Sequence, residues 1–417
     1  MCTLAFSFLD RAAFGVVLDN IKGDLGLSDT QMGIMGGIAF ALFYSTMGIP
    51  IAQWADSGNR VRIIGLTTAL WSVTVALCGL TRNFAQLLLV RVAVGVGEAG
   101  CVPAANSLLA DYFKRAERPR AAAIYWMGTP LGFGAGYVLA GWLNKFYGWR
   151  LTFMLLGLPG LILALVSWMT LREPRVAKFE EQATSAADQI QPDPQSLASV
   201  LVTLWGNATF RNLLLCLSVM YFFSYGILQW QPAFLMRSYG LSTGQVGSWF
   251  AAIYGLGGLV GTYWGGEWAA RHASLNERGQ LLACVTIYAA LSLVSLFNFL
   301  PLGLIVNIGS LAIVGVAQQM ISGPFLGIVQ TLVPERMRAI SIALMFLCAN
   351  LIGMGGGPLA VGALSDALRP SLGQGSLRYA LLATCPGYLW VAWHFWRASQ
   401  TVTRDLSADH GLSRAEI

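Results

Sequence analysis

The sequence predicts an all-α membrane protein with twelve transmembrane helices in two pseudo-symmetric six-helix bundles. Three observations predict this class: the composition, the spacing of long apolar runs, and a partial repeat between the two halves. Apolar residues make up 56% of the 417-residue chain and charged residues only 11%, against roughly 25% charged residues in a typical soluble protein. The composition therefore excludes a soluble multidomain protein.

The net charge of +6 does not indicate a nucleic-acid-binding protein, because lysines and arginines fall in short connections between apolar runs. The seven cysteines are scattered and form no CxxC pair, and the three histidines lie at span ends or in the tail. We therefore expect no metal site and no disulfide framework. The sequence holds no Walker A pattern, so we expect neither ATP-driven chemistry nor another cofactor.

Apolar runs of the length that crosses a bilayer, about 20 residues, recur along the whole chain. The expected spans are 1–20, 30–54, 62–81, 84–111, 119–144, 149–171, 209–236, 243–270, 279–299, 302–332, 337–366 and 377–397. The first run starts at Met1 without a signal-peptide pattern, as expected for a chain that begins inside its first helix. The expected parts are a first bundle 1–172, a linker 173–207 with one short surface helix, a second bundle 208–398, and a polar, mobile tail 399–417.

The distribution of basic residues sets the expected orientation. Seventeen lysines and arginines lie in the even-numbered connections, the linker region and the tail, and seven lie in the odd-numbered connections. The side that carries more of them is normally cytoplasmic. We therefore expect a multi-pass protein of the cell (inner or plasma) membrane, with both termini and the linker in the cytoplasm.

The two halves of the chain match in sequence at corresponding places. The matching segments are Gly26–Gly33 with Gly240–Gly247, Val94–Gly97 with Val314–Ala317, and Gly132–Gly136 with Gly353–Gly357. Parallel repeats of six spans imply two similar bundles around a site near the membrane midplane, and this layout suits alternating access.

Ionisable residues break the symmetry of this repeat. In matching registers, charged residues of the first half face neutral ones of the second: Asp10 with Ser224, Arg11 with Tyr225, Arg91 with Leu311, and Glu98 with Gln318. A charge at the centre of a span costs at least about 2.5–3.5 kcal/mol, so such residues usually serve a transport pathway. We interpret Asp10, Glu98 and Arg91 as a proton-coupling set between spans one and four. The alternative is a static network that only fixes helix packing.

Helical spacing limits how these charges can meet. Arg91 and Glu98 are seven residues apart, which places them on one helix face, roughly 10 Å apart along the axis. We expect a partner from another helix, such as Asp10, to lie between them. For Arg11 two alternatives are open, namely pairing with Asp10 and contact with an anionic headgroup.

Two further groups of residues are candidates for function. Acid–arginine pairs spaced by four residues, Asp56 with Arg60 and Glu267 with Arg271, stand at the cytoplasmic ends of spans two and eight. We interpret them as conformational clamps, with simple topology anchors as the alternative. The candidate substrate-binding residues combine two arginines with aromatic and amide side chains, each of which has lipid contact or packing as the alternative: Arg11, Arg91, Tyr125, Trp126, Tyr221, Tyr225, Gln229, Trp230 and Gln318.

The six–linker–six layout, the Asp56–Arg60 loop and the Arg91-x-x-x-Gly-x-Gly run resemble the major facilitator superfamily. Within it, the first half is most similar to spinster-type transporters. The segments that carry this similarity are Asp10-Arg11, Arg91–Ala99, Pro130–Tyr137, Trp149-Arg150, Pro159-Gly160 and Arg172–Pro174. The resemblance implies the major facilitator fold, a monomer, and proton-linked movement of lysolipids or sphingoid lipids. It also implies coupling at the positions of Asp10, Arg91 and Glu98.

Three functions follow from these observations. The first is a proton-coupled secondary active transporter of an amphipathic, lipid-like substrate, whose partners are protons, that substrate and membrane lipids. The second is a proton-linked organic-anion or sugar-acid symporter, because such symporters share an Asp-Arg near the start and a Gly-x-Gly-Glu in span four. The third, a membrane enzyme or receptor, is disfavoured because the sequence shows no catalytic triad, metal set or large extramembrane domain.

Overall fold

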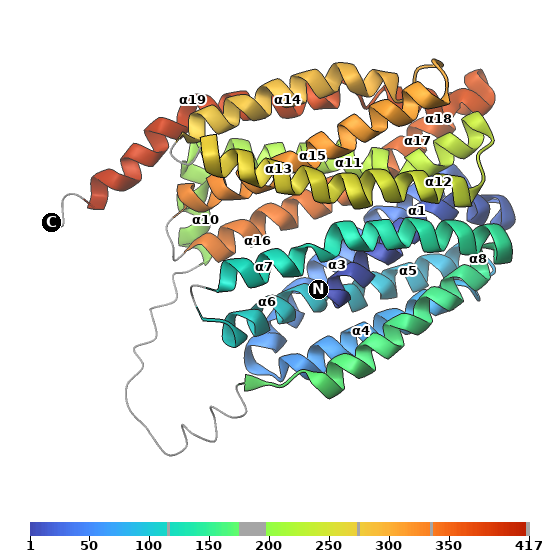
Figure 1. The fold of residues 1–417 in the computed structure, drawn as a ribbon, viewed down its shortest axis with the longest axis horizontal. Coiled ribbons are helices and arrows are strands. Elements are labelled where there is room, and N and C mark those ends of the chain that lie inside the picture. Colours follow the sequence, from blue (N-terminus) through green and yellow to red (C-terminus); the bar gives the residue numbers. More distant parts are fainter. Residues whose placement is uncertain (115–116, 175–196, 273–275, 334–336, 414–417) are drawn as a thin grey trace. The chain divides into compact units, whose positions relative to one another are not determined.

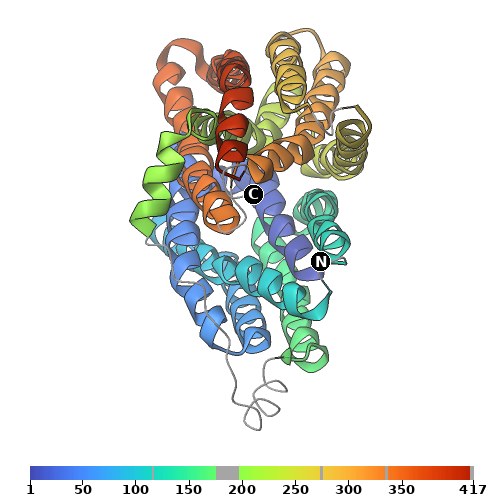
Figure 2. The same cartoon turned by 90° about the vertical axis from the view of Figure 1, so that its left-hand side faces the viewer.

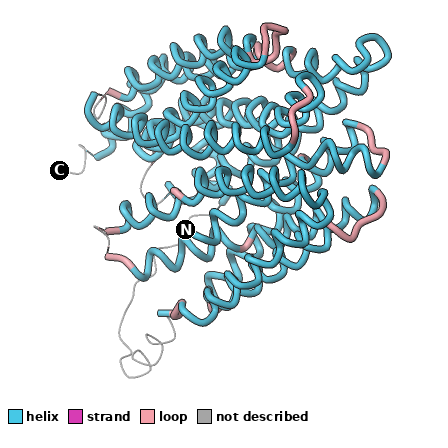
Figure 3. The backbone as a smooth tube through the Cα atoms, turned by 45° about the vertical axis from the view of Figure 1, so that its right-hand side comes forward, coloured by secondary structure: helices cyan, strands magenta, loops and turns pink. Residues whose placement is uncertain are grey.

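The computed structural model describes residues 1–114, 117–174, 197–272, 276–333 and 337–413. Each regular element in these ranges is a helix, and short loops join the helices (Figure 3). The chain divides into two compact units. Unit 1 comprises Met1–Asp193 with Gly240–Ala251, and unit 2 comprises Pro194–Tyr239 with Ala252–Ile417.

The helices of unit 1 correspond to the first six expected spans (Figure 1). They are α1 (Cys2–Leu25), α2 (Asp29–Gly36), α3 (Ile38–Ser57), α4 (Arg60–Cys78), α5 (Phe84–Ala99), α6 (Cys101–Tyr112), α7 (Arg118–Trp126) and α8 (Gly128–Thr170). Spans two and four are each broken once, at Gly37 and at Gly100. Spans five and six join into α8, with a kink at Gly148, whose φ of 77° favours glycine.

Unit 2 holds one short preceding helix and the other six expected spans, except for the first part of the span 243–270, which belongs to unit 1. The elements are α10 (Leu197–Gly206), α11 (Ala208–Tyr239), η1 (Ala251–Leu256), α13 (Gly257–His272), α14 (Glu277–Phe297), α15 (Leu304–Leu332), α16 (Arg338–Cys348), η3 (Ala349–Met354), α17 (Gly355–Leu372), η4 (Gly373–Gly375), α18 (Ser376–Leu382) and α19 (Gly387–Ser413). The helix α10 lies within the expected linker 173–207, for which the sequence predicted one short helix without giving its position. Two π-helical turns, η1 and η3, interrupt spans eight and eleven.

Eight helical stretches among the described residues are long and apolar enough to cross a membrane. Two of these stretches, Arg120–Thr170 and Ile340–Leu406, are 51 and 67 residues long. A single crossing needs about 20 residues, so each of the two accommodates more than one expected span.

Glycines bring α1 and α8 into close contact inside unit 1, where the two helices run beside each other (Figures 1 and 2). A Cβ atom added at Gly132 would clash with the carbonyl oxygen of Ala5, and one at Gly136 would lie 2.6 Å from the carbonyl oxygen of Leu9. The glycine run seen in the sequence therefore lets the α8 backbone pack directly on α1. This packing holds in place the helix that carries Asp10 and Arg11.

Two segments differ from their expected places. The sequence assigned residues 240–251 to the second bundle, but α12 (Thr243–Phe250) packs on α8 in unit 1. There the hydroxyl of Thr243 donates to the carbonyl oxygen of Gly141 at 2.9 Å. The backbones approach closely because both Gly141 and Gly247 lack a Cβ.

The tail also differs, because α19 continues past the expected end of the last span and is helical to Ser413. The Asp405 carboxylate on this extension accepts hydrogen bonds from the backbone N–H and the hydroxyl of Thr209, at 2.9 and 2.7 Å. It thereby satisfies a free N–H group at the start of α11. This cap gives the tail a packing partner that hydropathy does not reveal.

Candidate functional site

Two glycines of α5 determine how its charged residues enter the core of unit 1. A Cβ atom at Gly95 would lie 2.9 Å from the carbonyl oxygen of Phe40 on α3, and one at Gly97 would lie 2.7 Å from the Cβ atom of Trp71 on α4. The helix thus packs closely on both neighbours. As a result, Arg91 and Glu98 are each only 2% exposed.

The first buried ion pair joins Arg91 to Asp10 of α1. The Arg91 Nη1 atom donates to Asp10 Oδ2 at 3.0 Å, and the Arg91 guanidinium lies 4.2 Å from the ring centroid of Phe14. Asp10 is 1% exposed. Asp10 Oδ1 and Arg91 Nε have no hydrogen-bond partner in the part of the chain that the structure describes. The expected contact between Asp10 and Arg91 is therefore present, and both groups keep unused hydrogen-bonding capacity.

The second buried ion pair joins Glu98 to Arg11. Arg11 donates from Nη2 and Nε to Glu98 Oε2, at 2.9 and 3.2 Å. The Ser7 hydroxyl donates to the same oxygen at 2.7 Å. The sequence did not identify Glu98 as the partner of Arg11, nor did it identify Ser7, because the rotation of α1 against α5 decides both contacts.

Aromatic rings surround the Arg11 guanidinium. Its central carbon lies 5.1 Å from the ring centroid of Phe8 and 4.9 Å from those of Phe40 and Tyr44. Cation–π contacts of this kind contribute about 0.5–2 kcal/mol each, more where water is excluded. The Arg11 side chain is 13% exposed, compared with 3% for Arg91. Of the two arginines, Arg11 is the one that solvent can reach.

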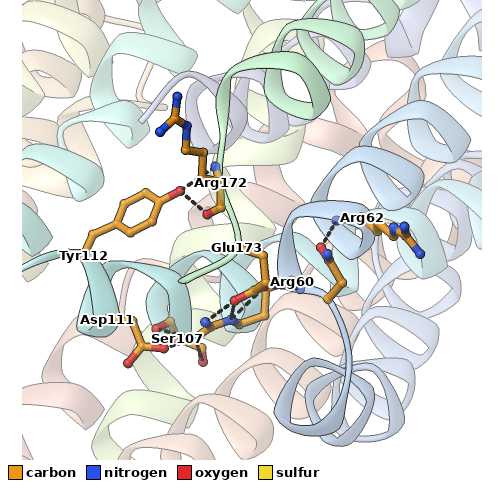
Figure 4. A network of polar contacts seen from close by, with 8 residues as sticks. Arg60, Arg62, Ser107, Asp111, Tyr112, Arg172 and Glu173 are labelled. Carbon is orange, nitrogen blue, oxygen red and sulfur yellow. Dashed lines mark hydrogen bonds and ion pairs between the residues drawn. The ribbon is translucent and has the colours of Figure 1, made fainter. Parts of the chain in front are cut away.

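A second polar network lies at the start of α4 (Figure 4). The fully buried Arg60 guanidinium donates to Asp111 Oδ2 at 2.6 Å and forms an ion pair with Glu173. Its backbone N–H also donates to Glu173 Oε2 at 2.7 Å. Arg60 thereby links α4 to α6 and to the segment that follows α8. The side chain of its predicted partner, Asp56, lies outside the described part of the structure.

Nearby side chains extend this network (Figure 4). The Arg60 Nη1 atom donates to the carbonyl oxygen and hydroxyl of Ser107, both at 3.1 Å. The Tyr112 hydroxyl donates to the carbonyl oxygen of Arg172 at 2.5 Å and accepts from its N–H at 2.9 Å. Asp111 and Glu173 were missed because they are 51 and 113 residues from Arg60. In the sequence, Glu173 could have been noticed because it lies in the Arg172–Pro174 segment, which is similar to spinster-type transporters.

The corresponding pair in unit 2 is of a different kind. Glu267 and Arg271 form an ion pair at 2.5 Å within α13, and their side chains are 35% and 69% exposed. An exposed pair of this spacing typically contributes only about 0.3–0.5 kcal/mol. The two predicted clamps thus differ in burial and in the number of elements that they join.

The aromatic candidates of unit 1 lie on α7. Tyr125 is 3% exposed, and its hydroxyl has no partner among the described residues. Trp126 is 45% exposed, and its ring centroid is 5.9 Å from that of Tyr125. Although they are adjacent in sequence, the Tyr125 side chain is buried and the Trp126 side chain is exposed.

The candidates of unit 2 lie in two places. On α11, the rings of Tyr221 and Tyr225 are 5.3 Å apart, and the amide nitrogen of Gln229 has no partner in the described residues. Trp230 is fully buried and donates to the carbonyl oxygen of Pro358 at 2.9 Å, so its ring packs between helices. On α15, Gln318 donates to the Tyr388 hydroxyl at 2.9 Å.

The described residues hold no group of three or more His, Cys, Asp or Glu side chains that could bind a metal ion. An all-α membrane protein with two six-span units, one of which buries charges between its helices, has the architecture of a transporter. The family model of the Major Facilitator Superfamily matches residues 1–358, and the chain belongs to this family. The protein is therefore a multi-pass membrane protein and a secondary transporter, not an enzyme.

Similar proteins refine this assignment. The chain is 30% identical to an MFS-type efflux pump of Mycolicibacterium smegmatis. The 405 matched residues cover 96% of this chain and 91% of the relative. It is 27% identical to a probable L-galactonate transporter of Escherichia coli, over 64% of this chain and 59% of the relative. Its fold matches a bacterial homolog of the human lysosomal transporter Spinster, solved inward-facing and unoccupied, with a TM-score of 0.81, 28% identity, and coverage of 97% and 96%. The predicted resemblance to spinster-type transporters is thus confirmed.

Proposed function

We propose that this protein is a proton-coupled transporter of an amphipathic, anionic, lipid-like substrate of the lysolipid or sphingoid class, working by alternating access. The observation that carries the proposal is the Arg11–Glu98 ion pair, in which one partner is reachable and the other is buried. The lysolipid or sphingoid class is what the resemblance to spinster-type transporters implies, and the similarity to the bacterial Spinster homolog supports that resemblance. The excess of basic residues in the even-numbered connections supports a cell-membrane location with both termini cytoplasmic. We propose that the transporter acts as a monomer.

The ion pair links substrate binding to proton binding. A substrate anion that contacts Arg11 weakens the ion pair with Glu98. A buried carboxylate without its counter-ion is strongly disfavoured, at a cost of about 3–5 kcal/mol. Glu98 therefore takes up a proton when the substrate occupies Arg11. The rings of Phe8, Phe40 and Tyr44 offer apolar surface to the part of the substrate next to its headgroup.

The second ion pair completes the coupling set in this proposal. Asp10 exchanges a proton as its contact with Arg91 changes between conformations. Direct contact of Arg91 with substrate requires a conformational change, because its side chain is 3% exposed. The Arg60 network is the stronger of the two proposed clamps, since it joins three elements of unit 1.

Neutral carboxamide variants test the coupling directly. We expect Glu98→Gln and Asp10→Asn each to reduce pH-gradient-stimulated transport of a fluorescent lysolipid in proteoliposomes at least about tenfold, which corresponds to about 1.4 kcal/mol. Glu117→Gln is the matched control, because Glu117 is an exposed acid that belongs neither to the proposed coupling set nor to the proposed clamps. Wild-type rates with unchanged pH dependence in both variants would contradict the proposal.

A second candidate function is supported by the relationship to the probable L-galactonate transporter. In this alternative, a small organic anion or sugar acid binds Arg11, and the same carboxylates carry the protons. The two candidates differ in substrate and share the coupling chemistry.

A further inference from the structure

The hydroxyl of Ser7 is a polar group beside Glu98 that the proposed coupling set does not include. Ser7 is 6% exposed, and its Oγ atom donates to Glu98 Oε2 at 2.7 Å. Ser7 lies four residues before Arg11, so both side chains project from the same face of α1. Donors from two successive turns of one helix therefore converge on a single carboxylate.

The Glu98 carboxylate receives these donors on one oxygen only. Oε2 accepts from Ser7 Oγ and from Arg11 Nε and Nη2. Oε1 is buried and has no hydrogen-bond partner among the described residues. A neutral carboxyl group carries its proton on one oxygen, and here only Oε1 is free of competing donors.

We propose that Ser7 is a positioning residue for Glu98. Its hydroxyl holds Oε2 toward Arg11 and leaves Oε1 as the oxygen that takes the proton. The inference rests on the proposed proton coupling at Glu98 and goes beyond it, because it assigns the orientation of the carboxyl group to a neutral side chain. The hydroxyl stabilises the ionised carboxylate, as hydrogen bonds to charged groups do.

The matching position in unit 2 differs in a way that supports this role. At the offset of 214 that aligns Gly26 with Gly240, Ser7 corresponds to Tyr221. There the counterpart of Glu98 is Gln318, and its amide donates to Tyr388 on α19. The serine is therefore present in the half of the repeat that carries the carboxylate Glu98, and absent from the half that carries Gln318.

Other ionisable groups also act on Glu98. From α1 these are Arg11 and the negative charge of Asp10, and from α6 the Cys101 thiol. From α3, Tyr44 lies against the Arg11 guanidinium. Replacement of Ser7 by alanine leaves all of these groups in place, so a change in Glu98 protonation reports the loss of the hydroxyl.

The test is an infrared titration of the full chain in nanodiscs without substrate. The signal is the protonated-carboxyl band that disappears in Glu98→Gln, and the measured quantity is the pH at which this band is half-developed. We expect Ser7→Ala to move that midpoint upward by about one pH unit, because the ionised form loses a charge-assisted hydrogen bond. Ser7→Thr keeps the hydroxyl and should stay within about 0.3 unit of the wild type.

The matched control is Ser72→Ala, which removes another buried hydroxyl of unit 1, one that donates within α4 to the carbonyl oxygen of Thr68 at 2.6 Å. Its midpoint should equal that of the wild type. If Ser7→Ala does not fold, Ser7→Cys supplies a weaker donor of similar size and should give a smaller upward shift.

Two outcomes would overturn the assignment. One is a folded Ser7→Ala, or Ser7→Cys in its place, with an unchanged midpoint, and the other is an equal shift in Ser72→Ala. If Glu98→Gln loses no carboxyl band, Glu98 does not bind a proton under these conditions. That result would contradict both this inference and the proposed coupling. Because no substrate is present, failure to transport lysolipid would contradict the proposed substrate and leave the Ser7 result standing.

Discussion

Arg11 and Arg91 illustrate how the same side chain serves two purposes in one site. Both guanidinium groups contact aromatic rings and a carboxylate, but their exposure differs, at 13% and 3%. The Arg91–Asp10 pair is sealed between α1 and α5, and breaking it would leave a buried charge without a partner. In the Arg11–Glu98 pair, the Arg11 side chain is partly exposed and the Glu98 side chain is buried. In the proposed function, this difference in exposure makes Arg11, and not Arg91, the arginine that meets the substrate first.

A residue-scale prediction concerns Asp24, beyond the end of the first expected span. The hydrogen bond from Arg150 lowers the pKa of Asp24 below its ordinary value, and a hydrogen bond from the Trp149 indole N–H acts in the same direction. A lowered pKa means that the folded state favours the ionised carboxylate. Its contribution to stability is present above the ordinary pKa of about 3.9 and is lost as the pH falls through the folded-state pKa.

We therefore expect Asp24→Asn to lower the melting temperature by about 1–2 °C at pH 7, because the pair is exposed and screened by solvent. The difference from the wild type should shrink progressively as the pH falls below about 4. Tryptophan fluorescence during heating measures both values. Arg150→Gln should lower the melting temperature at pH 7 by at least as much, because it also removes the hydrogen bond to the carbonyl oxygen of Thr81. A difference that is independent of pH would argue against the ion pair as its cause.

At the level of helices, close backbone contacts at glycines decide which elements pair. The contacts of α8 with α1 and with α12 both depend on positions without a Cβ atom, as does the contact of α5 with α4. Where lipid replaces water, close packing of this kind is a main source of helix association. The glycines thus set the helix positions on which the ion pairs depend.

An element-scale prediction concerns Gly247 of α12. An added Cβ atom would clash with the carbonyl oxygen of Tyr137 on α8. We expect Gly247→Ala to lower the free energy of unfolding by about 1–3 kcal/mol, the usual cost of overpacking, despite the better helix propensity of alanine.

Thermal unfolding in detergent measures this loss. The control is Gly266→Ala on α13, because a Cβ atom there meets nothing within 4 Å. This variant should be neutral or slightly stabilised. Equal melting temperatures for the two variants would show that the α8–α12 contact tolerates a methyl group.

At the scale of the whole molecule, the two halves share a helix plan and differ in chemistry. Unit 1 carries the Arg91–Asp10 and Arg11–Glu98 ion pairs, whereas the matching register of unit 2 holds Gln318 hydrogen-bonded to Tyr388. The ion pairs need low-dielectric surroundings and fixed partners, which a single compact unit supplies. We infer that unit 1 carries the coupling and that unit 2 mainly shapes the selection of substrate.

The substrate class is the prediction that belongs to this scale, because it concerns the function of the whole protein. In proteoliposomes that take up a fluorescent lysolipid, we expect unlabelled lysolipids to compete and galactonate or hexuronates to compete at least about tenfold more weakly. The physical reason is that a sugar acid reaches Arg11 but leaves the rings around it uncovered. Competition only by the small acids would favour the organic-anion function.

Local properties of the chain were sufficient to predict the spans, their approximate bounds and the repeat. Hydropathy works here because a spanning segment must be apolar and must satisfy its own backbone hydrogen bonds. It did not predict the breaks at Gly37 and Gly100 or the extension of α19 to Ser413, because packing and a cap from Asp405 decide those features. The sequence identified Arg60 as a candidate but not its partners Asp111 and Glu173, because these come from distant segments.

The charges of the first half were visible in the sequence as residues without counterparts in the second. Their burial followed from position alone, because a charge near the middle of an apolar run lies inside the membrane. Which carboxylate meets which arginine was decided by tertiary structure. A contact of about 3 Å between two helices depends on their rotation and separation. Here glycines of α8 pack on α1, and glycines of α5 pack on α3 and α4. For the same reason, the role proposed for Ser7 becomes visible only once those helices are packed.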